Sequence, residues 1–120
     1  MPRILLIDDT PETADLLTFA LRDLGHEVFA TGYTTDVNEL VMEQHADALV
    51  LNCSAFDMSE SLFDTVRQHP DHAALPVVII TDTEREADMS LRARNARKAL
   101  LVPKPFTAAQ VARALGEVLA

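Results

Sequence analysis

The chain has 120 residues, a net charge of −9 and a single cysteine, with 48% hydrophobic and 24% charged side chains. This composition is typical of one soluble domain, so we expect residues 1–120 to form a single domain, and the lone Cys53 excludes a scaffold held by disulfides. The negative charge argues against direct binding of nucleic acid, and no apolar run approaches the ~20 residues of a membrane span. Since no signal peptide follows Met1, we expect a cytoplasmic location.

Acidic residues are concentrated in the first half of the chain. Residues 1–64 hold thirteen Asp or Glu against two bases, whereas residues 65–120 hold six acids against eight bases. Such an excess indicates either an ordinary solvated surface or carboxylates gathered where a cation is held. The position of the acids in the fold has to decide between these two interpretations.

Strand and helix patterns alternate along the chain. The short apolar run at residues 3–7 is typical of a buried strand, and a helix with Thr10 as N-cap and Pro11 at its first position runs from there to Leu24. The same unit then recurs four times. Further strands are expected at residues 26–31, 47–52, 76–81 and 99–102, and further helices at residues 34–45, 59–69, 83–97 and from 107 onward. Capping boxes are expected for two of these helices, from Thr83 with Glu86 and from Thr107 with Gln110.

Five strand–helix units in this order predict an α/β fold with a parallel sheet. A crossover helix has to return each strand in the same direction, which places helices on both faces of the sheet. The chain is too short for a closed eight-stranded barrel, so we expect an open, doubly wound, three-layer α/β/α arrangement. In such sheets ligands bind in the crevice at the carboxyl ends of the strands.

Polar residues stand at four of the expected strand ends. They are Asp8 and Asp9 after the first strand, Asn52 at the end of the third, Thr81 at the end of the fourth and Lys104 after the fifth. Each alone has an ordinary structural explanation, such as a helix cap, a hydroxyl bonded to backbone or a surface lysine. Adjacent carboxylates repel each other, however, and Mg²⁺ with its preference for oxygen ligands would stabilise them. Together these residues predict a site for Mg²⁺ and a phosphoryl group.

These residues and their spacing resemble the receiver domain of two-component response regulators. The resemblance covers the whole chain, including Lys104-Pro105-Phe106 after the fifth strand and the register of residues 47–60. It implies a flavodoxin-like sheet with strand order 2-1-3-4-5 and a cis bond between Lys104 and Pro105. In this family a kinase histidine transfers a phosphoryl group to an aspartate at the end of the third strand.

The resemblance also implies a role for each residue at the strand ends. The metal ligands would be Asp9 directly, Asp8 through water and Ser54 through its backbone carbonyl, and the phosphoryl contacts would be Thr81 and Lys104. The cofactor implied by this ligand set is Mg²⁺.

The phosphoacceptor position of the family is occupied by Asn52. A carboxamide oxygen is neutral and weakly nucleophilic, so we predict that Asn52 does not accept phosphate. The amide also removes one negative charge from the metal cluster, although its carbonyl can still coordinate, so we expect weakened Mg²⁺ binding. We expect neither Asp47, which opens the strand at its opposite end, nor Asp57, in the following loop, to replace the acceptor.

Other positions depart from the family pattern as well. Asp82 stands where a small residue is usual, Glu60 where Gly is usual, and Leu101 where an aromatic residue is common. Ordinary drift explains Glu60 and Leu101 as well as a functional change does, whereas Asp82 adds negative charge beside the phosphoryl site. Cys53 is expected to point away from the crevice as a small buried hydrophobe, and the four histidines lack the spacing of a zinc site.

The sequence therefore predicts a pseudo-receiver, which is not an enzyme and acts as a phosphorylation-independent interaction module. We expect a protein partner or a second copy to bind the face formed by the fourth helix, the fifth strand and the fifth helix, where the chain carries Arg92, Arg94, Arg97 and Lys98. The helix dipole explains the position of these bases equally well. A histidine kinase is the other partner that the resemblance implies.

Two alternatives stay open. The chain could be a conventional phosphoacceptor receiver that carries an engineered Asp-to-Asn change at position 52. It could also be a small Mg²⁺-dependent phosphatase of haloacid-dehalogenase type, which places Asp, Thr and Lys at strand ends too. The nucleophile motif of that class is Asp-x-Asp, however, whereas this chain has Asp8-Asp9-Thr10.

Overall fold

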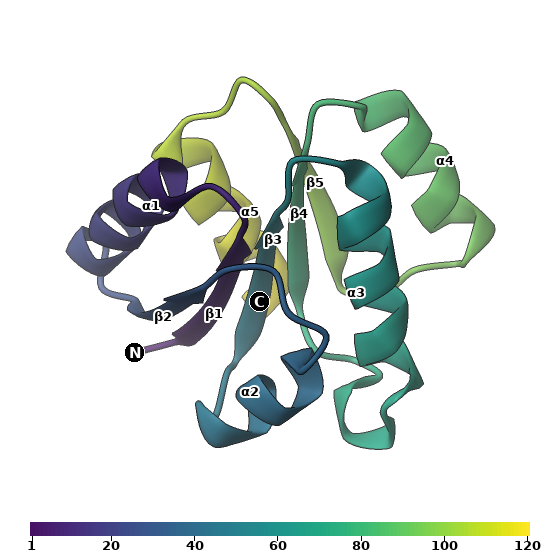
Figure 1. The fold of residues 1–120 in the computed structure, drawn as a ribbon, viewed down its shortest axis with the longest axis horizontal. Helices are drawn as coiled ribbons and strands as arrows, with labels where there is room; N and C mark the ends of the chain where they lie inside the picture. The colour runs from purple at the N-terminus through teal and green to yellow at the C-terminus, as the bar shows by residue number, and fades with distance from the viewer.

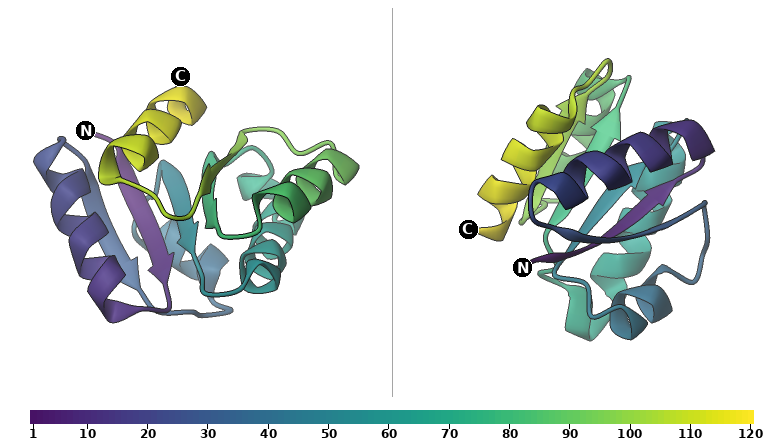
Figure 2. Two further views of the ribbon diagram at one scale, coloured as in Figure 1. Left: turned by 90° about the horizontal axis from the view of Figure 1, so that it is seen from above. Right: turned by 90° about the vertical axis from the view of Figure 1, so that its left-hand side faces the viewer.

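A five-stranded parallel sheet lies between two layers of helices in the computed structural model, which describes residues 1–120 (Figures 1 and 2). The strands are β1 (Arg3–Asp8), β2 (Glu27–Thr31), β3 (Ala48–Asn52), β4 (Val77–Thr81) and β5 (Ala99–Pro103). Their order is β2-β1-β3-β4-β5, and every pair is parallel. The predicted doubly wound, flavodoxin-like sheet of order 2-1-3-4-5 is confirmed.

The helices cover both faces of the sheet. They are α1 (Pro11–Asp23), α2 (Val37–Glu43), α3 (Phe56–Gln68), α4 (Glu84–Ala93) and α5 (Ala108–Leu119), with a 3-10 helix η1 (Pro70–His72) before β4. Helices α1 and α5 pack on one face, and α2 and α3 pack on the other, with α4 beside α3 and β5 (Figures 1 and 2). No helix combines the length and the apolar character needed to cross a membrane.

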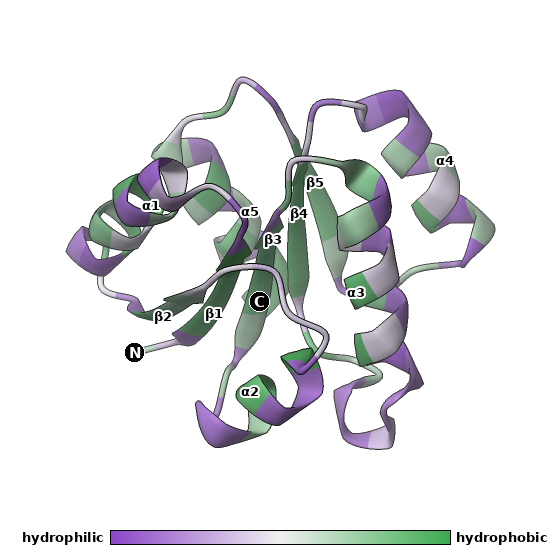
Figure 3. Ribbon diagram, viewed as in Figure 1, coloured by the Kyte–Doolittle hydropathy of each residue, from purple (hydrophilic) through white to green (hydrophobic).

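Two apolar cores, one on each face of the sheet, explain the continuous hydrophobic runs of the central strands. In β1, Ile4 and Leu6 pack into the core under α1 and α5, while Leu5 and Ile7 pack into the core under α2 and α3. Successive side chains of a strand point to opposite faces, so a strand covered on both sides is apolar between its ends. The middle parts of the central strands are accordingly apolar (Figure 3).

Several helix boundaries differ from those predicted. Helix α2 begins at Val37 rather than residue 34, and α3 begins at Phe56 rather than residue 59, so that Asp57 lies in a first helical turn and not in a loop. Helix α4 ends at Ala93, before residue 97. The reason is Asn95, whose φ of 49° lies in the left-handed region where helices commonly end.

Only one of the two predicted capping boxes forms. At the start of α5, the Gln110 backbone N–H donates to Thr107 Oγ1 at 3.2 Å and the Thr107 N–H donates to Gln110 Oε1 at 2.7 Å. The predicted box at α4 is wrong, because Thr83 makes no side-chain cap bond and its hydroxyl lies 3.2 Å from Thr81 Oγ1. Thr10 is the N-cap of α1, as predicted, but its side chain forms no cap bond either.

Candidate functional site

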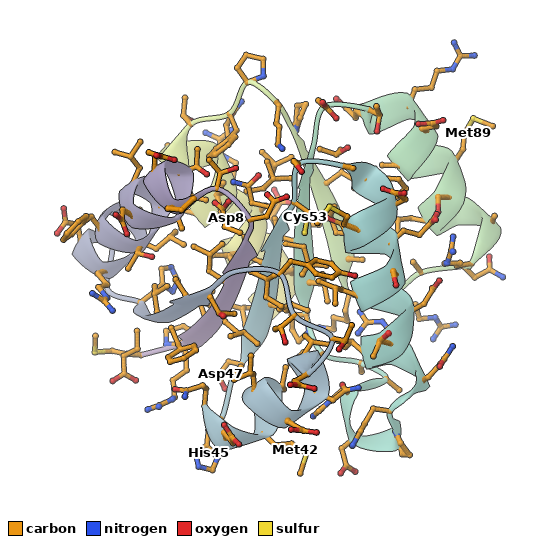
Figure 4. All side chains as sticks on the ribbon, in the orientation of Figure 1. Asp8, Met42, His45, Asp47, Cys53 and Met89 are labelled. Atoms are coloured by element: carbon orange, nitrogen blue, oxygen red, sulfur yellow. The ribbon has the colours of Figure 1, made fainter.

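The residues predicted at the strand ends gather at the carboxyl edge of the sheet. Asp8 and Asn52 are register partners across β1 and β3, and they are 3% exposed each, while Thr81 at the end of β4 is 2% exposed. Figure 4 shows Asp8 and Cys53 at this edge and Asp47 at the opposite end of the sheet. There Asp47 accepts a hydrogen bond from the Arg3 backbone N–H at 2.7 Å, so it is far from the site, as predicted.

The Asp8 carboxylate accepts three hydrogen bonds from neighbouring protein groups. Asn52 Nδ2 donates to Asp8 Oδ2 at 2.9 Å, and the Thr13 hydroxyl donates to the same oxygen at 2.8 Å. The Thr10 backbone N–H donates to Oδ1 at 2.8 Å. Hydrogen bonds to a carboxylate stabilise its charge, so these three donors offset part of the cost of burying Asp8.

The Asp9 carboxylate is held by one neighbouring residue. Its Oδ2 accepts hydrogen bonds from the Ser54 backbone N–H at 3.1 Å and the Ser54 hydroxyl at 2.5 Å. Partial burial raises the pKa of Asp9, but the bonds from Ser54 and the charge of Lys104 outweigh it, so this pKa lies below its ordinary value. Asp9 is therefore ionised over the physiological range.

Two buried oxygens at this edge have no hydrogen-bond partner. They are Asp9 Oδ1 and Asn52 Oδ1. Carboxylate and amide oxygens are the ligands that Mg²⁺ prefers, so the type of donor fits this ion. No group of three or more His, Cys, Asp or Glu side chains gathers as a metal site, however. The free oxygens of Asp9 and Asn52 are thus suitable Mg²⁺ ligands, but the site has one carboxylate fewer than the family pattern.

The two remaining predicted residues bond to nearby backbone. Lys104 Nζ donates to the Cys53 carbonyl at 3.1 Å, and Thr81 Oγ1 accepts from the Thr83 N–H at 3.0 Å. The bond between Lys104 and Pro105 is cis, as the resemblance implied. Cys53 is 2% exposed in the core under α2 and α3, which confirms the expected small buried hydrophobe, and burial raises the pKa of its thiol.

An acidic hollow between α3 and α4 opens beside the site and was not predicted. Its charged lining consists only of carboxylates, those of Asp57, Glu60, Asp82 and Glu86. Ser54, which bonds Asp9, lies at its edge. The sequence signal was the placement of acids at the starts of two helices, but only their packing side by side joins these acids into one surface.

Two of the four bases predicted to bind a partner are paired within the chain. Arg92 Nε donates to Asp88 Oδ2 at 2.8 Å on the exposed side of α4. Arg94 does not extend from the predicted face; it reaches across to α3 and contacts Asp64 at 2.8 Å. Arg97 and Lys98 lie in the loop after α4 rather than in the helix.

Comparison with known proteins identifies the class. The family model described as "Response regulator receiver domain" matches residues 4–116. The chain therefore belongs to the response regulator receiver domain family of two-component signalling. Its fold and its strand-end residues agree with this membership, which favours a receiver over the phosphatase considered above.

Particular relatives support the same class. PilH of Pseudomonas aeruginosa is 27% identical over 123 aligned positions, which cover 100% of this chain and 99% of that protein. Among solved structures, the chemotaxis response regulator CheY4 of Vibrio cholerae has a TM-score of 0.82 at 20% identity and covers 98% of each chain. The receiver domain of the sensor histidine kinase PA1611 of Pseudomonas aeruginosa, with magnesium in its active-site cleft, has a TM-score of 0.74 at 22% identity, covering 98% of this chain and 97% of that one. These two structures share the fold with this chain.

Proposed function

We propose that residues 1–120 form one receiver-like signalling domain that does not accept phosphate at position 52 and acts through phosphorylation-independent binding of proteins. The observation that carries the proposal is the hydrogen bond from Asn52 Nδ2 to Asp8 Oδ2. Asn52 therefore presents an N–H donor to Asp8, at the position where the family carries the anionic nucleophile. We also propose that the domain is a signalling domain without catalytic activity of its own.

The chemistry of the amide supports this proposal. Acceptance of a phosphoryl group needs an oxygen that can donate an electron pair to phosphorus and form a stable acyl phosphate. A carboxylate oxygen is anionic and does so, whereas the free Asn52 Oδ1 is the neutral end of a conjugated amide. Asp57, the next acid after Asn52 in the chain, forms no hydrogen bond with Asn52 or Asp9, and its side chain lines the hollow between α3 and α4.

The same arrangement supports weak binding of Mg²⁺. Asp9 Oδ1 and Asn52 Oδ1 would hold the ion, with Asp8 through water and the Ser54 carbonyl completing the set. When bound, Mg²⁺ would supply positive charge for phosphoryl oxygens, and Thr81 and Lys104 are the residues proposed to contact them. Both aspartates already receive hydrogen bonds from protein groups, so the site requires the cation less than a cluster of three carboxylates would.

We place the partner surface on α4, β5 and α5. Arg97 and Lys98 are exposed there, whereas Arg92 and Arg94 have acidic partners within the chain. The partner would be an acidic protein surface or a second copy, and a histidine kinase is the further candidate in a two-component pathway. The domain is expected to work in the cytoplasm without direct contact to nucleic acid or membrane.

The test is incubation with acetyl phosphate and Mg²⁺, followed by intact-mass measurement. We expect no phosphoryl adduct on the unmodified chain with Asn52, and an adduct there would overturn the proposal. Asn52→Asp is the matched variant, because the other site residues are unchanged. If Asn52→Asp gains phosphate readily, the other site residues still support phosphoryl transfer. That result would favour the alternative of an engineered or recently lost acceptor. If it does not, adding Asp82→Ala tests whether the extra acid beside Thr81 blocks the reaction.

A further inference from the structure

Helix α4 is held to the sheet by little apolar surface. Ala87 is its only fully buried residue, Leu91 is partly buried against the core, and Met89 is 63% exposed. Helix α3, in contrast, buries Leu62, Phe63 and Val66. Figure 3 shows the hydrophilic character of α4, and Figure 4 shows Met89 on its outer side. Hydrophobic burial alone therefore gives α4 a weak attachment.

A polar cluster joins the C-terminal end of α4, where Arg94 is the C-cap residue, to α3. Arg94 donates two parallel hydrogen bonds to the carboxylate of Asp64, from Nε at 2.8 Å and from Nη2 at 3.0 Å. Its Nη1 lies 3.4 Å from Glu60 Oε2, and the Ser90 hydroxyl hydrogen-bonds the same Glu60 oxygen. Paired guanidinium–carboxylate bonds of this kind are directional as well as strong. We call Glu60, Asp64, Ser90 and Arg94 the α3–α4 latch.

No other side-chain pair in the structure performs this role. Arg92 pairs with Asp88 inside α4, one turn away on the same helix, and so cannot hold α4 to α3. Arg67 of α3 donates to the carbonyls of Arg97 and Lys98, at 2.9 and 3.4 Å, which fixes the loop after α4 rather than the helix. The latch is thus the only ionic connection between the two helices.

We propose that the α3–α4 latch determines the position of α4 and that opening it releases this helix without any chemical change at Asn52. The inference goes beyond the proposed function, since it gives a domain that does not take phosphate a conformational input of its own. The ion pairs of Arg94 lie at the surface, so a carboxylate of a partner that competes for Arg94 would open the latch. Helix α4 belongs to the surface proposed to bind partners, so its release would change what that surface presents.

Hydrogen exchange of backbone amides, followed by mass spectrometry of peptides, tests the latch on the full chain. In Arg94→Ala we expect exchange across residues 84–93 to accelerate about tenfold or more, with the peptides of β1 and β3 unchanged. Arg92→Ala is the matched control, because it removes a neighbouring exposed arginine from the same helix, and its exchange should stay within about twofold of the original. Asp64→Asn, which keeps the shape of the partner, should reproduce the effect in part.

The salt dependence of hydrogen exchange is a second test of the latch. At about 1 M NaCl, where the screening length falls to about 3 Å, exchange in α4 should accelerate in the chain as given and change little in Arg94→Ala. Equal exchange in Arg94→Ala and Arg92→Ala, or a rise spread evenly over all peptides of both latch variants, would overturn the proposal. If Arg94→Ala fails to fold, Asp64→Asn and the salt series still decide the question. Neither hydrogen-exchange measurement depends on phosphate, so the proposed latch and the proposed function are tested independently.

Discussion

Asn52 and Asp8 face each other across β3 and β1, with the amide nitrogen 2.9 Å from the carboxylate oxygen. Both side chains are more than nine-tenths buried. Two carboxylates at this separation would repel each other by several kcal/mol, since unit charges 4 Å apart interact by about 4 kcal/mol at an effective dielectric constant of 20. A hydrogen-bond donor at position 52 turns this repulsion into attraction.

Asn52→Asp is therefore expected to make stability depend on Mg²⁺. Without the ion, the variant should lose about 1–3 kcal/mol in the free energy of unfolding, because a buried hydrogen bond is replaced by charge repulsion. Urea unfolding at pH 7, with and without Mg²⁺, measures this loss. Added Mg²⁺ should restore most of it in the variant and have little effect on the chain as given. Equal unfolding curves with and without Mg²⁺ in the variant would contradict the interpretation.

Ser54→Ala should change how stability depends on pH in the acidic range. Partial burial raises the pKa of Asp9, yet the bonds from Ser54 and the charge of Lys104 lower it below its ordinary value. A lowered folded-state pKa contributes stability above the unfolded value, and this contribution is lost as the pH falls through the folded one. The variant should thus be less stable than the original above about pH 4 and approach it at lower pH.

Urea unfolding between about pH 3 and 6 checks this expectation. Ser61→Ala is the control, since Ser61 is exposed on α3 and its hydroxyl forms no hydrogen bond in the structure. A stability difference for Ser54→Ala that does not change across this range would show that the hydroxyl does not act through the charge of Asp9.

His72 should make the chain less stable in weak acid. It is 5% exposed, its Nδ1 lies 2.6 Å from Asn38 Oδ1 on α2, and its ring stacks on His69 at 4.3 Å. Burial lowers the pKa of His72, the charge of His69 lowers it further, and Asp71 opposes the shift. The unfolded chain then binds more protons than the folded one, so stability should decrease as the pH falls below about 6.5.

His72→Gln should flatten this part of the pH profile, as measured by thermal unfolding between about pH 5 and 8. His45→Gln serves as the comparison, because His45 is exposed at the end of α2 and forms no side-chain hydrogen bond. If the profile of His72→Gln keeps the slope of the original, the buried histidine is not its origin.

Two threonines at helix starts should differ in their contribution to stability. Thr107→Ala removes the side-chain cap of α5 and should cost about 1 kcal/mol, because the Gln110 N–H loses its side-chain acceptor. Thr83→Ala at the start of α4 removes no cap bond and should cost less than half as much. Chemical denaturation of both variants gives the comparison, and equal losses would argue against the capping difference between the helices.

Much of the fold could be predicted because it depends on local pattern. The central strands are covered on both faces, so their sequences read as short apolar runs, and helices with one apolar face alternate with them. The predicted topology places Asp8, Asn52 and Thr81 at one edge, since the carboxyl ends of parallel strands share an edge. The identity of position 52 likewise needed only the sequence.

The partners of polar side chains were decided by the tertiary structure. The capping box at Thr83 failed because its hydroxyl lies against Thr81 instead. Arg94 was expected to face a partner, but Asp64, thirty residues earlier in the chain, comes within reach once α3 and α4 pack side by side. A hydrogen bond or ion pair depends on positions within a few tenths of an ångström, which sequence periodicity does not specify. The sheet, the order of its elements and the missing carboxylate at position 52 follow from local sequence patterns. The partners of Asp8 and Arg94 follow from packing, which brings residues far apart in the chain into contact.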